Sequence, residues 1–150
     1  ETSYWPAFSG AMSGGLDSFE GLPERWRDGY DKGTFRMNGP PPVRNNVTLV
    51  KGWFDDTLPR FVQEHPGPLS LLHVDSDLYS SAKTIFRYTG DRLIPGSIIV
   101  FDEYFNYPGW RDGEFKAWQE FVAESGISYR YIFYNRTHEQ VAVKITGCAA

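Results

Sequence analysis

The fold class is decided by the segment Leu69-Ser70-Leu71-Leu72-His73-Val74-Asp75-Ser76-Asp77. A nearly all-apolar run of this length is typical of a strand that is buried on both faces in a parallel sheet. The pattern returns in Ser97–Phe101, which is again followed directly by acidic residues. Between the two runs, Tyr79–Tyr88 carries apolar side chains at helical spacing. The sequence therefore predicts a strand, a helix and a second strand of an α/β fold.

Further predicted elements extend this alternation in both directions. Asn46–Lys51 is a β-branched run that predicts a strand, and an amphipathic helix follows it and ends before His65. Glu114–Glu124 predicts another helix. The runs Ser128–Tyr134 and Gln140–Ile145 are joined by a short link and predict an antiparallel hairpin. We therefore expect a Rossmann-like open sheet with helices on both faces and a C-terminal antiparallel hairpin at one edge.

Length and local composition indicate how the chain is organised. With 150 residues it is long enough for one domain with a hydrophobic core, and we expect a single domain over residues 1–150. The first 45 or so residues are rich in Gly, Pro, Asp and Arg without a clear period, and they predict mostly loop. The glycine-rich segment Ser9–Gly15 belongs to this predicted loop.

Charge and cysteine content limit the partners and the compartment. The net charge is −4, and no run of Lys or Arg is present to follow a phosphate backbone, which argues against nucleic acid. The one cysteine, Cys148, fits a reducing compartment. No stretch approaches the length of a membrane span, and the first residues do not resemble a signal peptide. We expect a soluble, cytoplasmic protein without a membrane partner.

Acidic side chains follow both buried strands. Asp75 and Asp77 come after the first strand, and Asp102 and Glu103 come after the second. Neighbouring parallel strands end at the same edge of a sheet, where carboxylates repel one another unless a cation compensates them. Oxygen ligands without Cys or paired His favour Mg²⁺ or Mn²⁺ over Zn²⁺. The other interpretation is that these residues cap the following helices, and spacing alone leaves both open.

Neighbouring residues have simpler interpretations. His73 lies in an apolar run, which is more typical of a core histidine than of a catalytic base. An aromatic group follows Glu103 and has two open interpretations, a substrate pocket or core packing. Its members are Tyr104, Phe105, Tyr107 and Trp110.

Four motifs in order along the chain resemble the macrocin/mycinamicin O-methyltransferase family of class I enzymes that depend on S-adenosyl-L-methionine. They are Asp17–Glu24, Lys51–Phe54 with Asp56–Pro59, His73–Tyr79, and Phe101–Tyr104. The resemblance extends from about Asp17 to Ile145. It implies an α/β methyltransferase sheet and a hydroxyl group of a small molecule, a sugar or natural product, as the methyl acceptor.

The resemblance also implies roles for individual residues. Asp17, with Ser18 beside it, would bind the ribose hydroxyls of S-adenosyl-L-methionine. The adenine would lie against Gly52, Trp53 and Phe54. Mg²⁺ would be held by Asp75, Asp102 and Glu103. Asp75 would also act as the catalytic group that accepts the proton of the acceptor hydroxyl.

One departure from the family pattern concerns the start of the chain. A class I methyltransferase opens with a strand, an acidic residue and a Gly-x-Gly turn, but only sixteen residues precede Asp17. A crossover unit takes roughly 30 residues, so we expect an N-terminally truncated domain that lacks the first strand–helix unit. The strand at Asn46–Lys51 would then pair with Leu69–Val74 or sit loosely.

Two alternatives to an active methyltransferase follow. The first is a non-catalytic remnant of the methyltransferase fold, whose open strand edge could support a homo-oligomer. The second is a glycosyltransferase, because Asp75-Ser76-Asp77 also resembles the Asp-x-Asp signature that holds Mn²⁺ and a nucleotide sugar. The second does not account for Asp102, Glu103 or the Asp17 motif.

Overall fold

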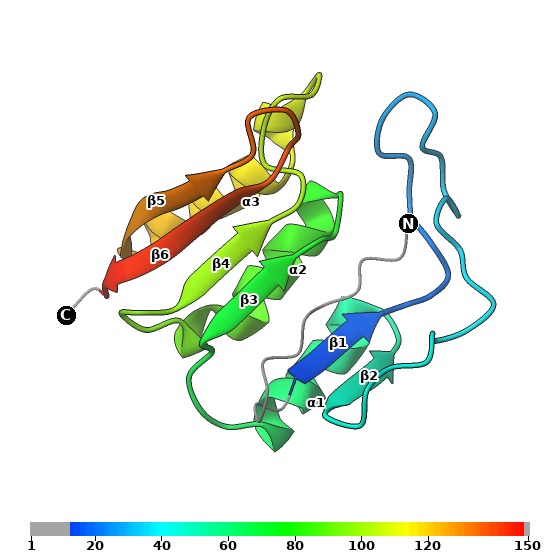
Figure 1. Cartoon of the computed structure of the whole chain (residues 1–150), viewed down its shortest axis with the longest axis horizontal. Helices are drawn as coiled ribbons and strands as arrows, with labels where there is room; N and C mark the ends of the chain where they lie inside the picture. Colours follow the sequence, from blue (N-terminus) through cyan, green and yellow to red (C-terminus); the bar gives the residue numbers. More distant parts are fainter. Residues whose placement is uncertain (1–12, 149–150) are drawn as a thin grey trace. The chain divides into compact units, whose positions relative to one another are not determined.

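The computed structural model describes residues 13–148 (Figure 1). The chain divides into two compact units, Glu1–Thr57 and Leu58–Ala150. A single domain over residues 1–150 therefore stays a prediction. Within residues 13–148, none of the helices combines the length and the apolar character needed to cross a membrane.

The first unit contains a parallel pair of strands, β1 (Ser13–Asp17) and β2 (Val47–Lys51). Gly15 of β1 lies opposite Leu49, and a Cβ atom at Gly15 would be 2.9 Å from the Leu49 Cδ2 atom. A glycine at this position therefore lets the two strands pack closely. Residues 18–46 connect the strands without a helix or a further strand, and Phe19 and Leu22 are buried within this connection.

Two expectations for this part of the chain are wrong. Ser13, Gly14 and Gly15 form a strand and not a loop, while the rest of the glycine-rich segment lies outside the described residues. Pairing with β2 creates this strand, although its own sequence has no β-branched pattern. β2 was expected to pair with the strand ending at Val74 or to sit loosely, but its partner is β1.

The second unit is built on a four-stranded sheet in the order β3-β4-β6-β5. β3 (Leu71–Val74) and β4 (Ile98–Phe101) run parallel, whereas β6 (Val141–Gly147) runs antiparallel to both β4 and β5 (Ser128–Tyr134). The predicted C-terminal hairpin is therefore confirmed as β5 and β6. The sheet is the mixed α/β arrangement expected from the sequence.

Helices connect these strands. α1 (Phe54–Glu64) begins in the first unit and ends in the second, and α2 (Tyr79–Thr89) follows β3. The 3-10 turns η1 (Gly90–Arg92) and η2 (Trp110–Asp112) precede β4 and α3 (Glu114–Ser125), respectively. α2 and α3 lie side by side on one face of the four-stranded sheet (Figure 1).

The core of the second unit is aromatic. Trp118 of α3 is completely buried. Its ring centroid lies 5.4 Å from that of Phe86 in α2 and 5.5 Å from that of Phe101 in β4. Tyr129 of β5 completes this contact at 5.0 Å. Helix α3 is thereby held against the strand whose carboxyl end carries Asp102 and Glu103.

The prediction that the strand ending at Val74 is buried on both faces is wrong for its first half. Val74 is completely buried, but Leu71 is 40% exposed. β3 lies at the end of the strand order in its sheet, so its residues receive neighbours from fewer directions than those of β4. The fully buried end of β3 is the end that leads into Asp75.

Candidate functional site

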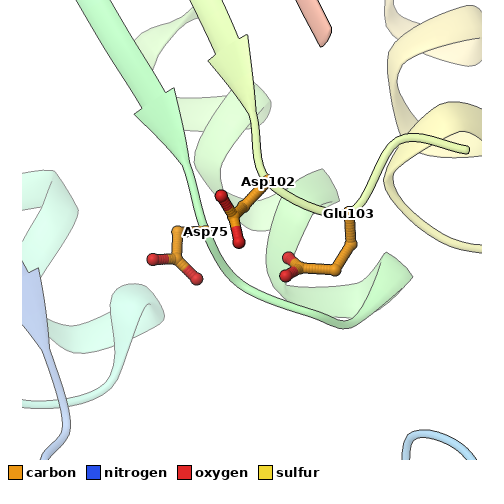
Figure 2. A group of neighbouring side chains, drawn as sticks. All are labelled: Asp75, Asp102 and Glu103. Atoms are coloured by element: carbon orange, nitrogen blue, oxygen red, sulfur yellow. The ribbon is translucent and has the colours of Figure 1, made fainter. Parts of the chain in front are cut away.

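Three carboxylates converge beyond the carboxyl ends of β3 and β4 (Figure 2). Val74 and Phe101 lie opposite each other in the parallel pair, and the Asp102 amide donates to the Val74 carbonyl at 2.9 Å. This register places Asp75 and Asp102 at the same edge. One carboxylate oxygen each from Asp75, Asp102 and Glu103 lies within 4.8 Å of the others. The structure therefore brings together all three predicted metal ligands.

The three side chains differ in burial. Asp75 is exposed, Asp102 is half-buried and Glu103 is only 8% exposed. Burial raises the pKa of Glu103 well above its ordinary value, and the nearby charges of Glu114 and Asp77 raise it further. The Oε2 atom of Glu103 is buried and has no hydrogen-bond partner within residues 13–148. A small cation would satisfy this oxygen and offset the repulsion, so the donor set fits Mg²⁺ or Mn²⁺.

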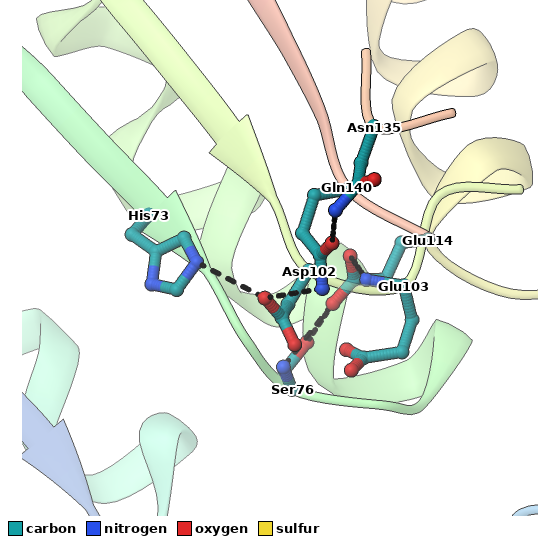
Figure 3. Close-up of polar contacts among 7 residues, drawn as sticks. All are labelled: His73, Ser76, Asp102, Glu103, Glu114, Asn135 and Gln140. Atoms are coloured by element: carbon teal, nitrogen blue, oxygen red, sulfur yellow. Dashed lines mark hydrogen bonds and ion pairs between the residues drawn. The ribbon is translucent and has the colours of Figure 1, made fainter. Parts of the chain in front are cut away.

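Asp102 is held from the C-terminal hairpin (Figure 3). The Gln140 side-chain amide donates to the Asp102 Oδ1 atom at 3.2 Å, and Asn135 donates to the Gln140 Oε1 atom at 2.9 Å. Sequence reasoning did not select Gln140 or Asn135. The available signal was that Asn135 begins the hairpin link and Gln140 follows it, which predicted a turn but not its contact with Asp102.

His73 lies next to the same carboxylate. Its Nε2 atom is 3.8 Å from the Asp102 Oδ1 atom, and its side chain is 11% exposed. Burial lowers the pKa of His73 to about 3, so the imidazole is neutral at neutral pH and this contact is not an ion pair. The prediction of a core histidine is consistent with this burial.

Glu114, the first residue of α3, is completely buried behind the carboxylates. Its Oε1 atom accepts hydrogen bonds from the Ser76 amide at 3.1 Å and the Ser76 hydroxyl at 3.2 Å. Its Oε2 atom accepts from the Glu103 amide at 3.3 Å (Figure 3). Burial raises the pKa of Glu114, while these hydrogen bonds oppose that rise. Sequence reasoning missed Glu114 because an acidic residue at a helix start is ordinary.

The residues predicted to bind the cofactor lie together in the first unit. Asp17 ends β1 and is exposed, and its carbonyl accepts a hydrogen bond from the Gly52 amide at 3.0 Å. Trp53 follows Gly52 and is 43% exposed, and Phe54 begins α1. This arrangement places an exposed carboxylate and an exposed aromatic ring at the carboxyl end of one parallel strand pair.

Local contacts shape this end of the pair. The Asp17 Oδ1 atom accepts from the Phe19 amide at 2.5 Å, and the buried Ser18 hydroxyl accepts from the Glu20 amide at 3.1 Å. Gly52 has φ +149°, and a Cβ atom there would lie 2.7 Å from the Thr57 Cγ2 atom. Gly52 therefore permits the turn from β2 into α1.

The aromatic residues after Glu103 serve mainly as packing. Tyr104 and Tyr107 are buried, and the Tyr104 ring lies 4.9 Å from the Phe101 ring. Trp110 makes an edge contact with Phe115 at 4.8 Å. Of the two open interpretations, the structure favours core packing for Tyr104 and Tyr107, whereas Trp110 is half-buried.

Comparison with known proteins identifies the family. The family model described as macrocin-O-methyltransferase (TylF) matches residues 42–132. The chain belongs to this family. The family resemblance is thereby confirmed, and three of the four motifs lie within the matched residues. The matched region of the macrocin-O-methyltransferase family includes β2, all three carboxylates and Glu114.

Two curated relatives come from Streptomyces. The chain is 32% identical over 107 residues to the 8-demethyl-8-(2,3-dimethoxy-alpha-L-rhamnosyl)-tetracenomycin-C 4'-O-methyltransferase of Streptomyces olivaceus, a match covering 59% of this chain and 40% of the relative. It is 29% identical over 139 residues to the demethyldecarbamoylnovobiocin O-methyltransferase of Streptomyces niveus, covering 80% of this chain and 50% of the relative. The chain thus spans half or less of the length of these relatives.

Solved structures share the fold. A calicheamicin methyltransferase has a TM-score of 0.70 at 24% identity, with 89% of this chain and 60% of that chain covered. The MycE methyltransferase from the mycinamycin biosynthetic pathway, in complex with Mg and SAH, has a TM-score of 0.56 at 14% identity, covering 91% of this chain and 45% of that chain. These likenesses support the class I methyltransferase fold.

Proposed function

We propose that the chain carries the acceptor-activating part of an S-adenosyl-L-methionine-dependent, Mg²⁺-assisted O-methyltransferase. The acceptor would be a hydroxyl group of a sugar or another small natural product. The observation that carries the proposal is the convergence of Asp75, Asp102 and Glu103, with one buried Glu103 oxygen left without a hydrogen-bond partner among the described residues. Family membership and the names of the two Streptomyces relatives support the reaction class.

The three carboxylates would have different roles because they differ in burial. We call the edge of the sheet that carries Asp75, Asp102 and Glu103 the rim. Glu103 and Asp102 would hold Mg²⁺ from the buried side of the rim, and Asp75 would complete the set from the exposed side. A bound Mg²⁺ would lower the pKa of an acceptor hydroxyl beside it. Because Asp75 is exposed, its carboxylate is accessible to accept the hydroxyl proton. The MycE structure with Mg supports a divalent ion in this fold.

The cofactor would be bound by the first unit. Asp17 offers an exposed carboxylate to the ribose hydroxyls, with Ser18 shaping its turn. Gly52 permits the turn from β2 into α1, and Trp53 with Phe54 would lie against the adenine. The chemistry of S-adenosyl-L-methionine is donation of its methyl group from a sulfonium centre to the acceptor oxygen.

The glycosyltransferase alternative requires Asp75 and Asp77 to hold Mn²⁺ together. Within the described residues, the group of converging acidic side chains contains Asp75 but not Asp77. Asp77 has φ +58°, in the left-handed region, one residue after the segment held by Glu114. The observations therefore favour the methyltransferase over this alternative.

The first experiment is calorimetric titration of S-adenosyl-L-methionine into the purified chain, with and without Mg²⁺. We expect binding in the micromolar range, about −8 kcal/mol, and weaker binding in Asp17→Ala. Asp28→Ala is the matched control, because Asp28 is exposed and its ion pair with Arg25 lies on the surface.

Two results would contradict the proposal. A folded chain that does not bind S-adenosyl-L-methionine would favour the non-catalytic remnant. A rise in unfolding temperature with a nucleoside diphosphate and Mn²⁺, absent with S-adenosyl-L-methionine, would favour the glycosyltransferase.

A further inference from the structure

We propose that Glu114 is a positioning residue whose carboxylate holds the segment after β3 and the segment after β4 at a fixed separation. The role of this spacing in binding a divalent cation rests on the proposed function. Glu114 does not belong to the converging carboxylates themselves, and it would act on them through the backbone.

The geometry of Glu114 joins two segments that are far apart in the sequence. Ser76 follows Asp75 directly. Its backbone amide and its hydroxyl both donate hydrogen bonds to the Glu114 Oε1 atom. Glu103 is itself one of the three carboxylates, and its backbone amide donates to the other oxygen of Glu114. One buried side chain thus contacts the backbone beside one predicted ligand and the backbone of another (Figure 3).

A carboxylate is the group that these donors require. Three donors face Glu114: two backbone N–H groups and one hydroxyl. A carboxylate presents two acceptor oxygens, whereas a glutamine amide presents one oxygen and an NH₂ group that would face the Glu103 N–H. Glutamine can therefore hold the Ser76 side of this arrangement but not both sides.

Burying the carboxyl group of Glu114 lowers the stability of the fold. Glu114 is completely buried, and the negative charge of its ionised form is disfavoured by burial and by the nearby Asp75 charge. Packed apolar residues would avoid that cost. The backbone ladder between β3 and β4 extends to the Asp102 amide and the Val74 carbonyl. Beyond that bond, Glu114 connects the two acid-bearing segments, whose carboxylates otherwise repel each other.

The test compares Glu114→Gln with the wild-type chain in two measurements. Amide hydrogen exchange by NMR, on the metal-free chain, reports the hydrogen bonds of Ser76 and Glu103 directly. Titration with Mn²⁺, followed by electron paramagnetic resonance, reports the affinity of the three carboxylates. The matched control is Glu120→Gln, because Glu120 lies on the same helix and bonds to Tyr79 and Lys83 at its surface.

We expect Glu114→Gln to speed exchange of the Glu103 amide while the Ser76 amide keeps most of its protection. We also expect Mn²⁺ affinity to fall by about 10- to 100-fold, the usual effect of removing a group that orients metal ligands. Glu120→Gln should change neither measurement. Ser76→Ala removes one of the three hydrogen bonds, so it should retain the fold and give a smaller loss of Mn²⁺ affinity.

Separate results bear on the two proposals. Wild-type exchange at Glu103 and wild-type Mn²⁺ affinity in folded Glu114→Gln would overturn the positioning role. If Glu114→Gln does not fold, a Ser76→Ala chain with unchanged Mn²⁺ affinity overturns it instead. A wild-type chain that does not bind Mn²⁺ overturns the proposed metal site, and the exchange of Ser76 and Glu103 then still decides whether Glu114 holds the segments.

Discussion

The Oε2 atom of Glu103 is buried without a hydrogen-bond partner within residues 13–148, and a cation would satisfy it. The side chain is 8% exposed, and burial is the main cause of its raised pKa. The folded chain therefore retains a proton that the unfolded chain releases above about pH 4.5. Folding stability from this group is present at low pH and is lost as pH rises, by about 1.4 kcal/mol per pH unit for one full proton.

We therefore expect Glu103→Gln to flatten the pH dependence of the metal-free chain. The unfolding temperature, measured by circular dichroism with a chelator present, should fall less in this variant than in the wild type between about pH 5 and pH 8. Glu124→Gln changes an exposed glutamate of α3 and is the control. Equal slopes in the wild type and Glu103→Gln would show that Glu103 titrates normally.

His73 should give a pH dependence of the opposite sign. Burial lowers its pKa to about 3, whereas the unfolded chain binds a proton below about pH 6.5. Stability from neutral His73 is present above that value and is lost as pH falls, again by about 1.4 kcal/mol per pH unit. Chemical denaturation of His73→Gln should show a smaller loss between about pH 6 and pH 4 than the wild type.

The control for His73 is His65→Gln, which replaces an exposed histidine at the end of α1. Glu103 and Glu114 are present in both variants, so their contribution cancels when each slope is compared with the wild type. A slope in His73→Gln that matches the wild type would contradict burial of the neutral ring.

At the scale of elements, the end of α3 depends on backbone conformation. Gly126 follows the helix with φ +67°, and its amide bonds to the Val122 carbonyl. Alanine is strained in this left-handed region, so Gly126→Ala should lower the free energy of unfolding by about 1 kcal/mol. Urea denaturation measures this difference. Gly147→Ala is the control, because a Cβ there meets only ordinary contacts, the nearest at 3.7 Å.

The elements that the sequence predicts correctly carry strong local patterns. The strand ending at Phe101 is a continuous apolar run, and the helix beginning at Tyr79 has apolar residues at helical spacing. The structure has both elements at nearly the predicted positions. β1 was missed because Gly14 and Gly15 have weak intrinsic strand preference, and only pairing with β2 makes them a strand.

The candidate site follows the same division. Asp75, Asp102 and Glu103 could be grouped from the sequence because parallel strands end at one edge of a sheet. Glu114 and Gln140 could not be identified. Their contacts depend on how α3 and the hairpin pack against the rim, which no local pattern encodes.

At the scale of the whole molecule, the two predicted sets of ligands are carried by different units. Asp17, Gly52 and Trp53 belong to the first unit. The three carboxylates, together with the Glu114 and Gln140 contacts that hold them, belong to the second. Each set is built from contacts inside its own unit, so residues of the second unit alone bring the three carboxylates together.

This separation predicts how variants of the full chain will behave. Asp102→Ala removes a carboxylate from the rim and the acceptor of the Gln140 amide, so Mn²⁺ affinity should fall by about tenfold or more. Asp17→Ala leaves every member of the rim in place, so Mn²⁺ affinity should stay at the wild-type value while S-adenosyl-L-methionine binding weakens. Calorimetric titration of both ligands into both variants measures the four affinities. A loss of Mn²⁺ affinity in Asp17→Ala equal to that in Asp102→Ala would mean that Asp17 is itself part of the cation site.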